Sequence, residues 1–229
     1  MSIRSKVLAA AATLALVSGF STVRTPAANA ATPQCGNGCI EIYSRLFGTS
    51  ADPNFVETVY RGVAKVGQPM ILSRASSSNP AQDLLPSMAG LVSDFFTAGL
   101  VSAEVNRHYG SLRATQIEYA PLGVTSGLCV GLATTAFQNE GLTLQRCSVS
   151  ARTVWIVDTA DSPTTAAEGF FPLVNGSTTD FCHPFAMTYP RNAYPTDKRP
   201  AQIRVRHLIN NPTHVPDRQL WGTAFGVLD

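Results

Sequence analysis

The chain has 229 residues, of which 45% are hydrophobic, a length and composition that suit one domain with a substantial apolar core. Its formal net charge is only +2. Three of the basic residues, Arg4, Lys6 and Arg24, precede residue 31, and without them 14 basic residues face 15 acidic ones, a net charge of −1. Such a chain has no basic field to attract a polyanion, so we expect no nucleic-acid partner.

The first thirty residues have the three-part pattern of a secretory signal peptide. Two basic residues precede an uncharged apolar run, Val7 to Phe20, and the segment closes on Ala28-Asn29-Ala30. The run is shorter than the roughly 20 residues that a membrane-spanning helix needs. We therefore expect residues 1–30 to be a cleaved signal peptide rather than a membrane anchor. Residues 31–229 would then form a secreted, extracellular domain without a membrane span.

Five cysteines follow the predicted signal peptide, and export places them in an oxidising compartment where disulfides form. Cys35 and Cys39 lie in Cys-Gly-Asn-Gly-Cys, whose glycines and asparagine allow a tight turn. Cys129 and Cys147 flank two strand-like runs, which suits a disulfide across a hairpin. Five cysteines allow many pairings. We expect the disulfides Cys35–Cys39 and Cys129–Cys147, with Cys182 left as a buried or capped thiol.

Short runs rich in β-branched and aromatic residues, separated by turn residues, predict an all-β domain. Two segments, Phe55 to Val66 and Leu91 to Val105, have partly helical spacing. β-Branched residues weaken a helix in the first and Gly99 interrupts the second, so we predict strand or irregular structure for both. The clearest predicted strands are Ile40–Tyr43, Met70–Leu72, Gln116–Tyr119, Leu142–Leu144, Val154–Val157 and Ile203–Arg206.

An internal repeat indicates the architecture. Three segments share one plan of strand, loop, second strand and apolar anchor. One such unit cannot bury its own apolar face, so three are expected to close around a shared core. We predict a single β-trefoil domain over 31–229, with four-stranded repeats at about 39–97, 98–160 and 161–229. The first strands and the anchors of this plan are Cys39-Ile40-Glu41-Ile42 with Leu84, Cys129-Val130-Gly131-Leu132 with Trp155, and Phe185-Ala186-Met187-Thr188 with Trp221.

The second and third repeats resemble the ricin-B-type β-trefoil lectin domain. That family has a Cys-Leu-Asp-Val-like strand, a Gly before a Val-x-Leu-x-x-Cys strand and a closing Gln-x-Trp. The second repeat contains Gly141-Leu142-Thr143-Leu144-Gln145-Arg146-Cys147, and the third closes with Gln219-Leu220-Trp221. The resemblance implies a carbohydrate-binding module. The whole chain also resembles a group of uncharacterised secreted bacterial proteins, which implies no function.

The departures from the lectin pattern concern its sugar sites. In that family the Asp of the first strand binds sugar hydroxyls, and the resemblance places Glu41, Gly131 and Met187 at this position in the three repeats. The second repeat also has Arg152-Thr153-Val154-Trp155 in place of Gln-x-Trp. We therefore expect at least two of the three family sites to be lost, although the fold can be kept without them.

Sugar binding needs an aromatic platform and a few fixed polar groups. Candidates lie in the loops between the marker strands. The alternative is that the aromatic residues border the core and the polar ones only form turns, whereas Trp155 and Trp221 are expected inside the core. The ligand-binding candidates are Glu41, Phe137, Asn139, Tyr189, Asn192 and Tyr194.

The sequence contains no nucleophile elbow, no Gly-rich phosphate loop and no His-Glu-x-x-His. Cys182 and His183 are adjacent, so on an extended chain their side chains point to opposite sides and form no dyad. We therefore expect no enzyme activity, no cofactor and no metal. Basic residues of the third repeat could bind acidic glycans or could simply be solvated; they are Arg191, Lys198, Arg199, Arg204, Arg206 and His207.

These observations predict a secreted, non-catalytic, monomeric module that binds a carbohydrate or a cell-surface polymer such as a cell-wall component. The alternative is a trefoil that binds a protein, for instance as an inhibitor of a secreted hydrolase. The segment from Thr49 to Val66 would be the presented loop in that case.

Overall fold

The computed structural model describes residues 38–48, 54–147, 150–209 and 214–225. All of them belong to one compact unit, Thr32–Asp229, and the predicted signal peptide and Cys35 lie outside the described residues. Within those residues, no helix has the length and hydropathy needed to cross a membrane. The helices are α1 Val92–Thr97, α2 Ala103–Tyr109 and α3 Pro163–Ala167, with 3₁₀ helices η1 Arg45–Phe47, η2 Tyr60–Gly62, η3 Pro80–Gln82, η4 Pro121–Gly123, η5 Ala151–Thr153 and η6 Asp217–Gln219.

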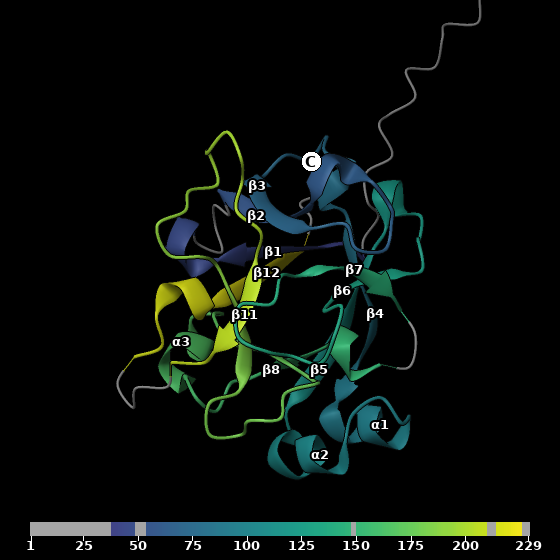
Figure 1. The fold of residues 1–229 in the computed structure, drawn as a ribbon, viewed down its shortest axis with the longest axis vertical. Helices are drawn as coiled ribbons and strands as arrows, with labels where there is room; N and C mark the ends of the chain where they lie inside the picture. The colour runs from purple at the N-terminus through teal and green to yellow at the C-terminus, as the bar shows by residue number, and fades with distance from the viewer. Residues whose placement is uncertain (1–37, 49–53, 148–149, 210–213, 226–229) are drawn as a thin grey trace, which may run out of the picture. The chain divides into compact units, whose positions relative to one another are not determined.

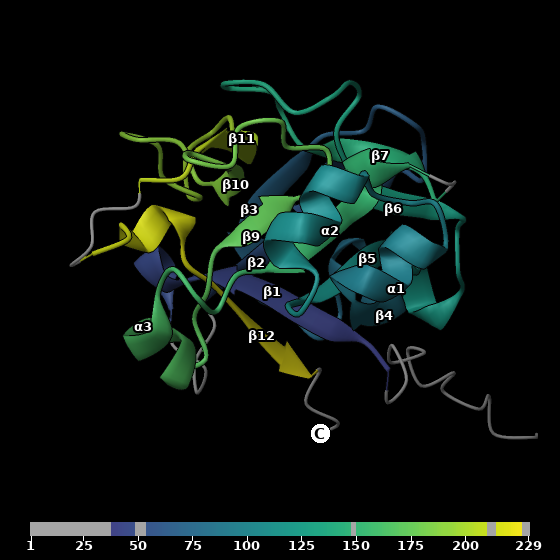
Figure 2. The ribbon, with the colours of Figure 1, turned by 90° about the horizontal axis from the view of Figure 1, so that it is seen from below.

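Twelve strands lie in the described part of the chain, and each predicted repeat range contains four of them. Six form a closed ring, in which β1 pairs with β12 and the order continues β1-β4-β5-β8-β9. A bridge between Phe171 and Trp221 closes the ring from β9 back to β12. Figure 2 shows β1 and β12 side by side. The strands are β1 Ile40–Ser44, β2 Phe55–Val59, β3 Met70–Arg74, β4 Leu84–Leu91, β5 Arg113–Tyr119, β6 Leu128–Gly131, β7 Thr143–Arg146, β8 Val154–Val157, β9 Leu173–Asn175, β10 Phe185–Thr188, β11 Arg204–His207 and β12 Trp221–Phe225.

The other six strands form three hairpins, β2–β3, β6–β7 and β10–β11. A cyclic set of hydrogen bonds joins them. The N–H of Met70 donates to the carbonyl of Leu142 (3.0 Å), Leu142 to Ile203 (2.8 Å) and Ile203 back to Met70 (2.9 Å). Three equivalent hairpins around a six-stranded ring are the architecture that the repeat predicts. Figure 1 shows that the β2–β3 hairpin lies at the opposite end of the domain from α1 and α2.

The predicted alignment of the first repeat is wrong by one strand. The counterparts of β6 and β10 are not β1 but β2, because Glu57, Val130 and Met187 face the equivalent residues Leu72, Leu144 and Val205 in their hairpins. The predicted loop from Thr49 to Val66 therefore contains a strand with the buried residues Val56 and Val59. Strand β2 therefore belongs to the core sheet, whereas the stretch that follows η2, from Val63 to Val66, is exposed.

The stretch from Leu91 to Val105, predicted as strand or irregular structure, is mainly helical. Helix α1 occupies its first part and α2 begins at Ala103. Gly99 lies between them with a φ of +73°, so it ends the first helix and leaves room for a second one. Ser102 caps α2, since its hydroxyl accepts the N–H of Val105. The buried residues Phe95 and Val105 pack these helices on the outer face of the ring.

Both tryptophans are core anchors, as predicted, with no exposed surface. They belong to the core inside the ring and hairpins, together with Met70, Leu72 and Leu144. Cys129 and Cys147 form the predicted disulfide across the β6–β7 hairpin. Cys39 is disulfide-bonded as well, and its predicted partner lies outside the described residues.

Candidate functional site

A pocket of about 530 Å³ lies where three distant segments meet. One is the end of η1, the second is the start of the β10–β11 connection, and the third leads into η6. The pocket combines exposed aromatic surface with amide, carboxylate and guanidinium groups. Its lining residues are Leu46, Phe47, Pro190, Arg191, Asn192, Ala193, Tyr194, His214, Pro216, Asp217 and Arg218.

Two predicted ligand-binding residues, Asn192 and Tyr194, line this pocket. Tyr194 has 63% of its surface exposed, so its ring is accessible as a platform. Its backbone N–H donates to the Asp197 carboxylate at 3.0 Å, which fixes the turn that presents the ring. Asn192 has a φ of +60°, a conformation that asparagine tolerates better than most residues.

Tyr189, also a predicted ligand-binding residue, is instead fully buried. Its ring packs edge-on against Phe47, which lines the pocket, with centroids 5.1 Å apart. Burial, with a smaller effect from the charge of Asp197, raises the pKa of the Tyr189 hydroxyl to about 12. Tyr189 therefore supports the pocket from the core and offers no surface to a ligand.

Arg45 lies beside the pocket and pairs with nearby carboxylates. It forms ion pairs with Glu168, at 2.9 Å, and with Asp217, at 3.4 Å. Its guanidinium also lies over the Phe170 ring, 5.6 Å from the centroid. The Asp217 carboxylate is thereby paired, whereas the side chains of Arg191 and Arg218 have no hydrogen-bond or ion-pair partner in the described part of the chain.

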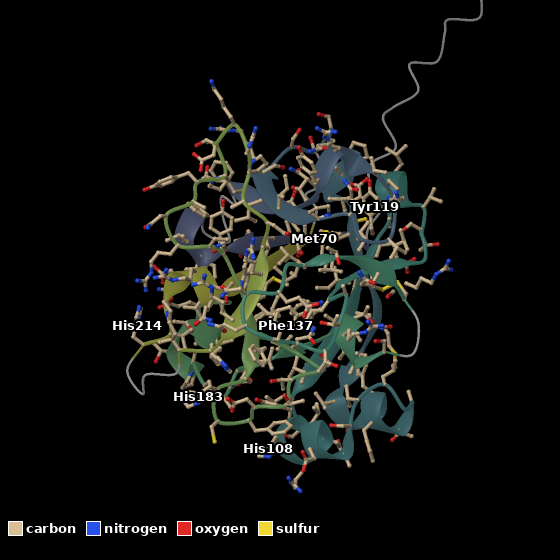
Figure 3. All side chains as sticks on the ribbon, in the orientation of Figure 1. Met70, His108, Tyr119, Phe137, His183 and His214 are labelled. Atoms are coloured by element: carbon tan, nitrogen blue, oxygen red, sulfur yellow. A yellow bond between two sulfur atoms is a disulfide. The ribbon has the colours of Figure 1, made fainter. Side chains whose placement is uncertain are left out.

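Phe137 and Asn139 form a separate group along the edge of β11. The N–H of Asn139 donates to the carbonyl of Val205 at 2.9 Å, and Arg204 donates to the carbonyl of Asn139 at 2.8 Å. Phe137 is 52% exposed. Figure 3 shows Phe137 well apart from His214 of the pocket, so the six predicted residues do not form one site.

Glu41 lies in β1 opposite Ala224 and is half-buried, and burial raises the pKa of its carboxyl. Because β2 is the true counterpart of β6 and β10, the first-repeat residue equivalent to Gly131 is Thr58, and in the third repeat it is Thr188 rather than Met187. The position that the lectin resemblance assigns to a sugar-binding Asp therefore holds no carboxylate in any repeat.

Cys182 is exposed, so the expectation of a buried thiol is wrong. The N–H groups of Cys182 and His183 both donate to the Asp180 carboxylate at 2.9 Å. These bonds, the one from His183 first, hold the pKa of that carboxyl below its usual range. The Nδ1 of the His183 ring lies 3.9 Å from the Asp180 carboxylate.

Sequence reasoning missed a smaller pocket of about 230 Å³ beside α2. His108 stacks on Phe181 there, with centroids 4.3 Å apart, and Asp158 and Asp161 lie in its wall. Burial, followed by the charge of Asp161, raises the pKa of Asp158 above its usual range. The spacing Asp158-x-x-Asp161 is the only sequence signal for it. Among the described residues, no group of three or more potential ligands could hold a metal ion.

Comparison with known proteins identifies the fold. The chain matches no family model and no curated protein. Among solved structures, it is similar to the designed threefold-symmetric protein ThreeFoil, with 15% identity over 82% of this chain and 98% of that one and a TM-score of 0.52. The fold is a β-trefoil.

The chain is also similar to the solved structure of the mdaA-1 domain, with 12% identity over 84% of this chain and 92% of that one and a TM-score of 0.51. The agglutinin from Abrus precatorius matches less closely, with 15% identity over 83% of this chain and 48% of that one and a TM-score of 0.43. At such low identity, the similarity to the β-trefoil structures establishes architecture alone.

Proposed function

We propose that this protein is a secreted, non-catalytic module that binds a carbohydrate or a cell-surface polymer in the pocket at η1, η6 and the β10–β11 connection. The observation that carries the proposal is the exposed Tyr194 ring at the edge of a 530 Å³ pocket that also contains Asn192 and Asp217. A sugar ring is recognised by an aromatic face and a few fixed polar groups. The pocket supplies both.

Thermal unfolding of the oxidised domain against a panel of polysaccharides and cell-wall polymers tests the proposal. A ligand at about a hundred times its dissociation constant adds roughly 2.7 kcal/mol, which raises the midpoint by several degrees. Tyr194→Ala should abolish the shift of any active polymer. Phe137→Ala is the matched control, because it removes an exposed aromatic ring outside the pocket and should leave the shift unchanged.

The two variants separate the possible outcomes. A shift that Tyr194→Ala removes and Phe137→Ala preserves supports the proposal. The reverse pattern moves the site to the Phe137–Asn139 group. If no polymer changes the midpoint of the unaltered protein, the proposed function is wrong.

A further inference from the structure

Arg152 and Arg218 occupy equivalent places in the second and third repeats. Each lies three residues before a core tryptophan, in Arg152-Thr153-Val154-Trp155 and Arg218-Gln219-Leu220-Trp221. The backbone confirms the equivalence: the carbonyl of Arg152 accepts the N–H of Leu132 at 3.2 Å, and that of Arg218 accepts the N–H of Tyr189 at 2.9 Å. The pair therefore allows a comparison of two arginines in the same local fold.

The two side chains differ in what they bind. The Arg152 Nε donates to the Ser150 hydroxyl at 3.1 Å, and its Nη1 donates to the carbonyl of Ala133. In the third repeat Pro216 replaces Ser150, so the side-chain acceptor is absent. The Arg218 Nε is buried without a hydrogen-bond partner in the described part of the chain. A buried donor without an acceptor is costly and uncommon in native proteins.

The Arg218 Nε is closed to solvent, so an external acceptor would reach the guanidinium through its two Nη groups, which also have no partner in the described part of the chain. Arg218 and Arg191 both line the 530 Å³ pocket, and Arg191 likewise has no side-chain partner among the described residues. Among the described residues that line the pocket, Asp217 alone has a carboxylate, and it already pairs with Arg45. Two free guanidinium groups thus share a pocket whose acidic group is paired.

We infer that Arg218, assisted by Arg191, binds an anionic group of the ligand, a carboxylate or a phosphate carried by a saccharide polymer. The planar guanidinium donates paired N–H bonds that match either group. Tyr194 and Asn192 would contact the neighbouring sugar ring. This inference rests on the proposed function and narrows it to acidic polymers, so a neutral polymer of the same backbone should bind much more weakly.

Binding is measured by calorimetry with two matched polymer pairs. One pair is polygalacturonate and its methyl ester, and the other is phosphorylated dextran and dextran. The acidic member of at least one pair should bind about ten- to hundredfold more tightly, the range expected for hydrogen bonds to a charged group. The pair that shows this preference identifies carboxylate or phosphate as the source. Raising the salt concentration should weaken the binding.

Arg218→Ala and Arg152→Ala make a matched pair of variants. Arg218→Ala should lose at least tenfold in affinity for the acidic polymer while its unfolding midpoint stays within a degree or two. Arg152→Ala should lower the unfolding midpoint and keep the affinity, because the Arg152 guanidinium bonds, within the described residues, only to Ser150 and Ala133 of the protein itself. Arg218→Lys should restore part of the affinity, since it keeps the charge without the paired donors.

The failures of the two proposals are distinguishable. Equal affinity for acidic and neutral polymers, unchanged in Arg218→Ala, overturns the anion inference and leaves the binding function intact. If no polymer binds, the proposed function fails, and galacturonate and inorganic phosphate then test the anion site directly at fixed ionic strength. If galacturonate or phosphate raises the unfolding midpoint and Arg218→Ala removes that increase, the result supports the anion site. If neither anion raises the midpoint, the anion inference is overturned.

Discussion

Trp155 and Trp221 make the same hydrogen bond in two repeats. The indole Nε1 of Trp155 donates to the carbonyl of Val130 at 2.9 Å, and that of Trp221 donates to the carbonyl of Met187 at 2.9 Å. In the first repeat Leu84 occupies the position of the tryptophan, and its side chain has no hydrogen-bond donor. The residue equivalent to Val130 and Met187 is Glu57, whose side chain is buried in the core with no partner for either oxygen in the described structure.

Glu57 predicts that the protein loses stability as the pH rises. Burial raises the pKa of its carboxyl from 4.5 to about 8. Below pH 4.5 the carboxyl is protonated in both states, so it makes no pH-dependent contribution to stability. Between pH 4.5 and 8 the unfolded state loses the proton first, so the free energy of unfolding falls, by roughly 3 kcal/mol at pH 7. Glu57→Met places at this position the residue that the third repeat has there, and it should remove that loss.

Urea unfolding of both proteins at pH 5, 6, 7 and 8 measures the difference. Other carboxyls, Asp158 among them, contribute equally to both profiles, so subtraction isolates Glu57. Glu104→Gln on the exposed face of α2 is the control and should keep the slope of the unaltered protein, because Glu104 is exposed. Parallel profiles for the unaltered protein and Glu57→Met would show that the carboxyl is already ionised in the fold.

Gln82 and Gln219 make equivalent hydrogen bonds in two repeats, and we expect both side chains to stabilise the fold. Gln82 donates to the carbonyl of Arg74 at 2.7 Å and accepts the N–H of Ser76 at 2.9 Å. Gln219 makes the equivalent bonds with His207 at 3.0 Å and Ile209 at 2.9 Å. Both side chains are buried. Replacing either with Ala leaves backbone groups unsatisfied and should cost about 2–4 kcal/mol in the free energy of unfolding.

The control for these variants is Gln145→Ala. Gln145 is half-buried, and its side-chain amide donates to the Thr143 hydroxyl at 2.8 Å. No backbone group depends on that bond, so its loss should cost less than about 1 kcal/mol. Equal effects of Gln82→Ala and Gln145→Ala in chemical denaturation would contradict a clamping role for the buried glutamines.

The sequence predicts the fold because the elements that close it are repeated. Trp155 and Trp221 each follow their repeat's marker strands along the sequence. Each repeat has one apolar face that it can bury only against the other two. The first repeat is misaligned because Cys39-Ile40-Glu41-Ile42 imitates the strand of Cys129, whereas the true counterpart carries Glu57 at a core position. A charged residue in a strand predicts a solvent-facing side chain, and here that expectation fails.

The candidate site is less predictable for a different reason. Phe47, Asn192 and Arg218 meet in one pocket from three segments that are far apart in the chain. Local spacing identifies Tyr194 and Asn192 as exposed polar or aromatic loop residues, but it contains no information on what packs beside them. The Arg218 side chain has no partner in the described structure because Pro216 offers no side-chain acceptor and because Asp217 pairs with Arg45 instead. Only the folded structure shows that pairing.

The disulfide between Cys129 and Cys147 should stabilise the domain by limiting the unfolded chain. It closes a loop with a sequence separation of 18, so replacing both residues with Ser should cost about 3 kcal/mol. Cys182→Ser should change stability by less than about 0.5 kcal/mol, because this thiol is exposed and free. Urea unfolding compares the variants, and a Cys182→Ser effect as large as that of the double variant would contradict the assigned pairing.

Leu122 predicts that adding a glycine can stabilise the protein. It has a φ of +58° and is 42% exposed, and the left-handed conformation costs a non-glycine residue about 1–2 kcal/mol. Leu122→Gly should therefore raise the free energy of unfolding by about 0.5–1 kcal/mol, after the greater freedom of glycine in the unfolded chain is counted. Val124→Gly is the matched control, two residues along the same exposed turn with a φ of −93°. It should lower stability by a similar amount, because no strain is relieved there. Opposite signs in urea unfolding are the expected result, and a loss of stability in both variants would show that Leu122 is not strained.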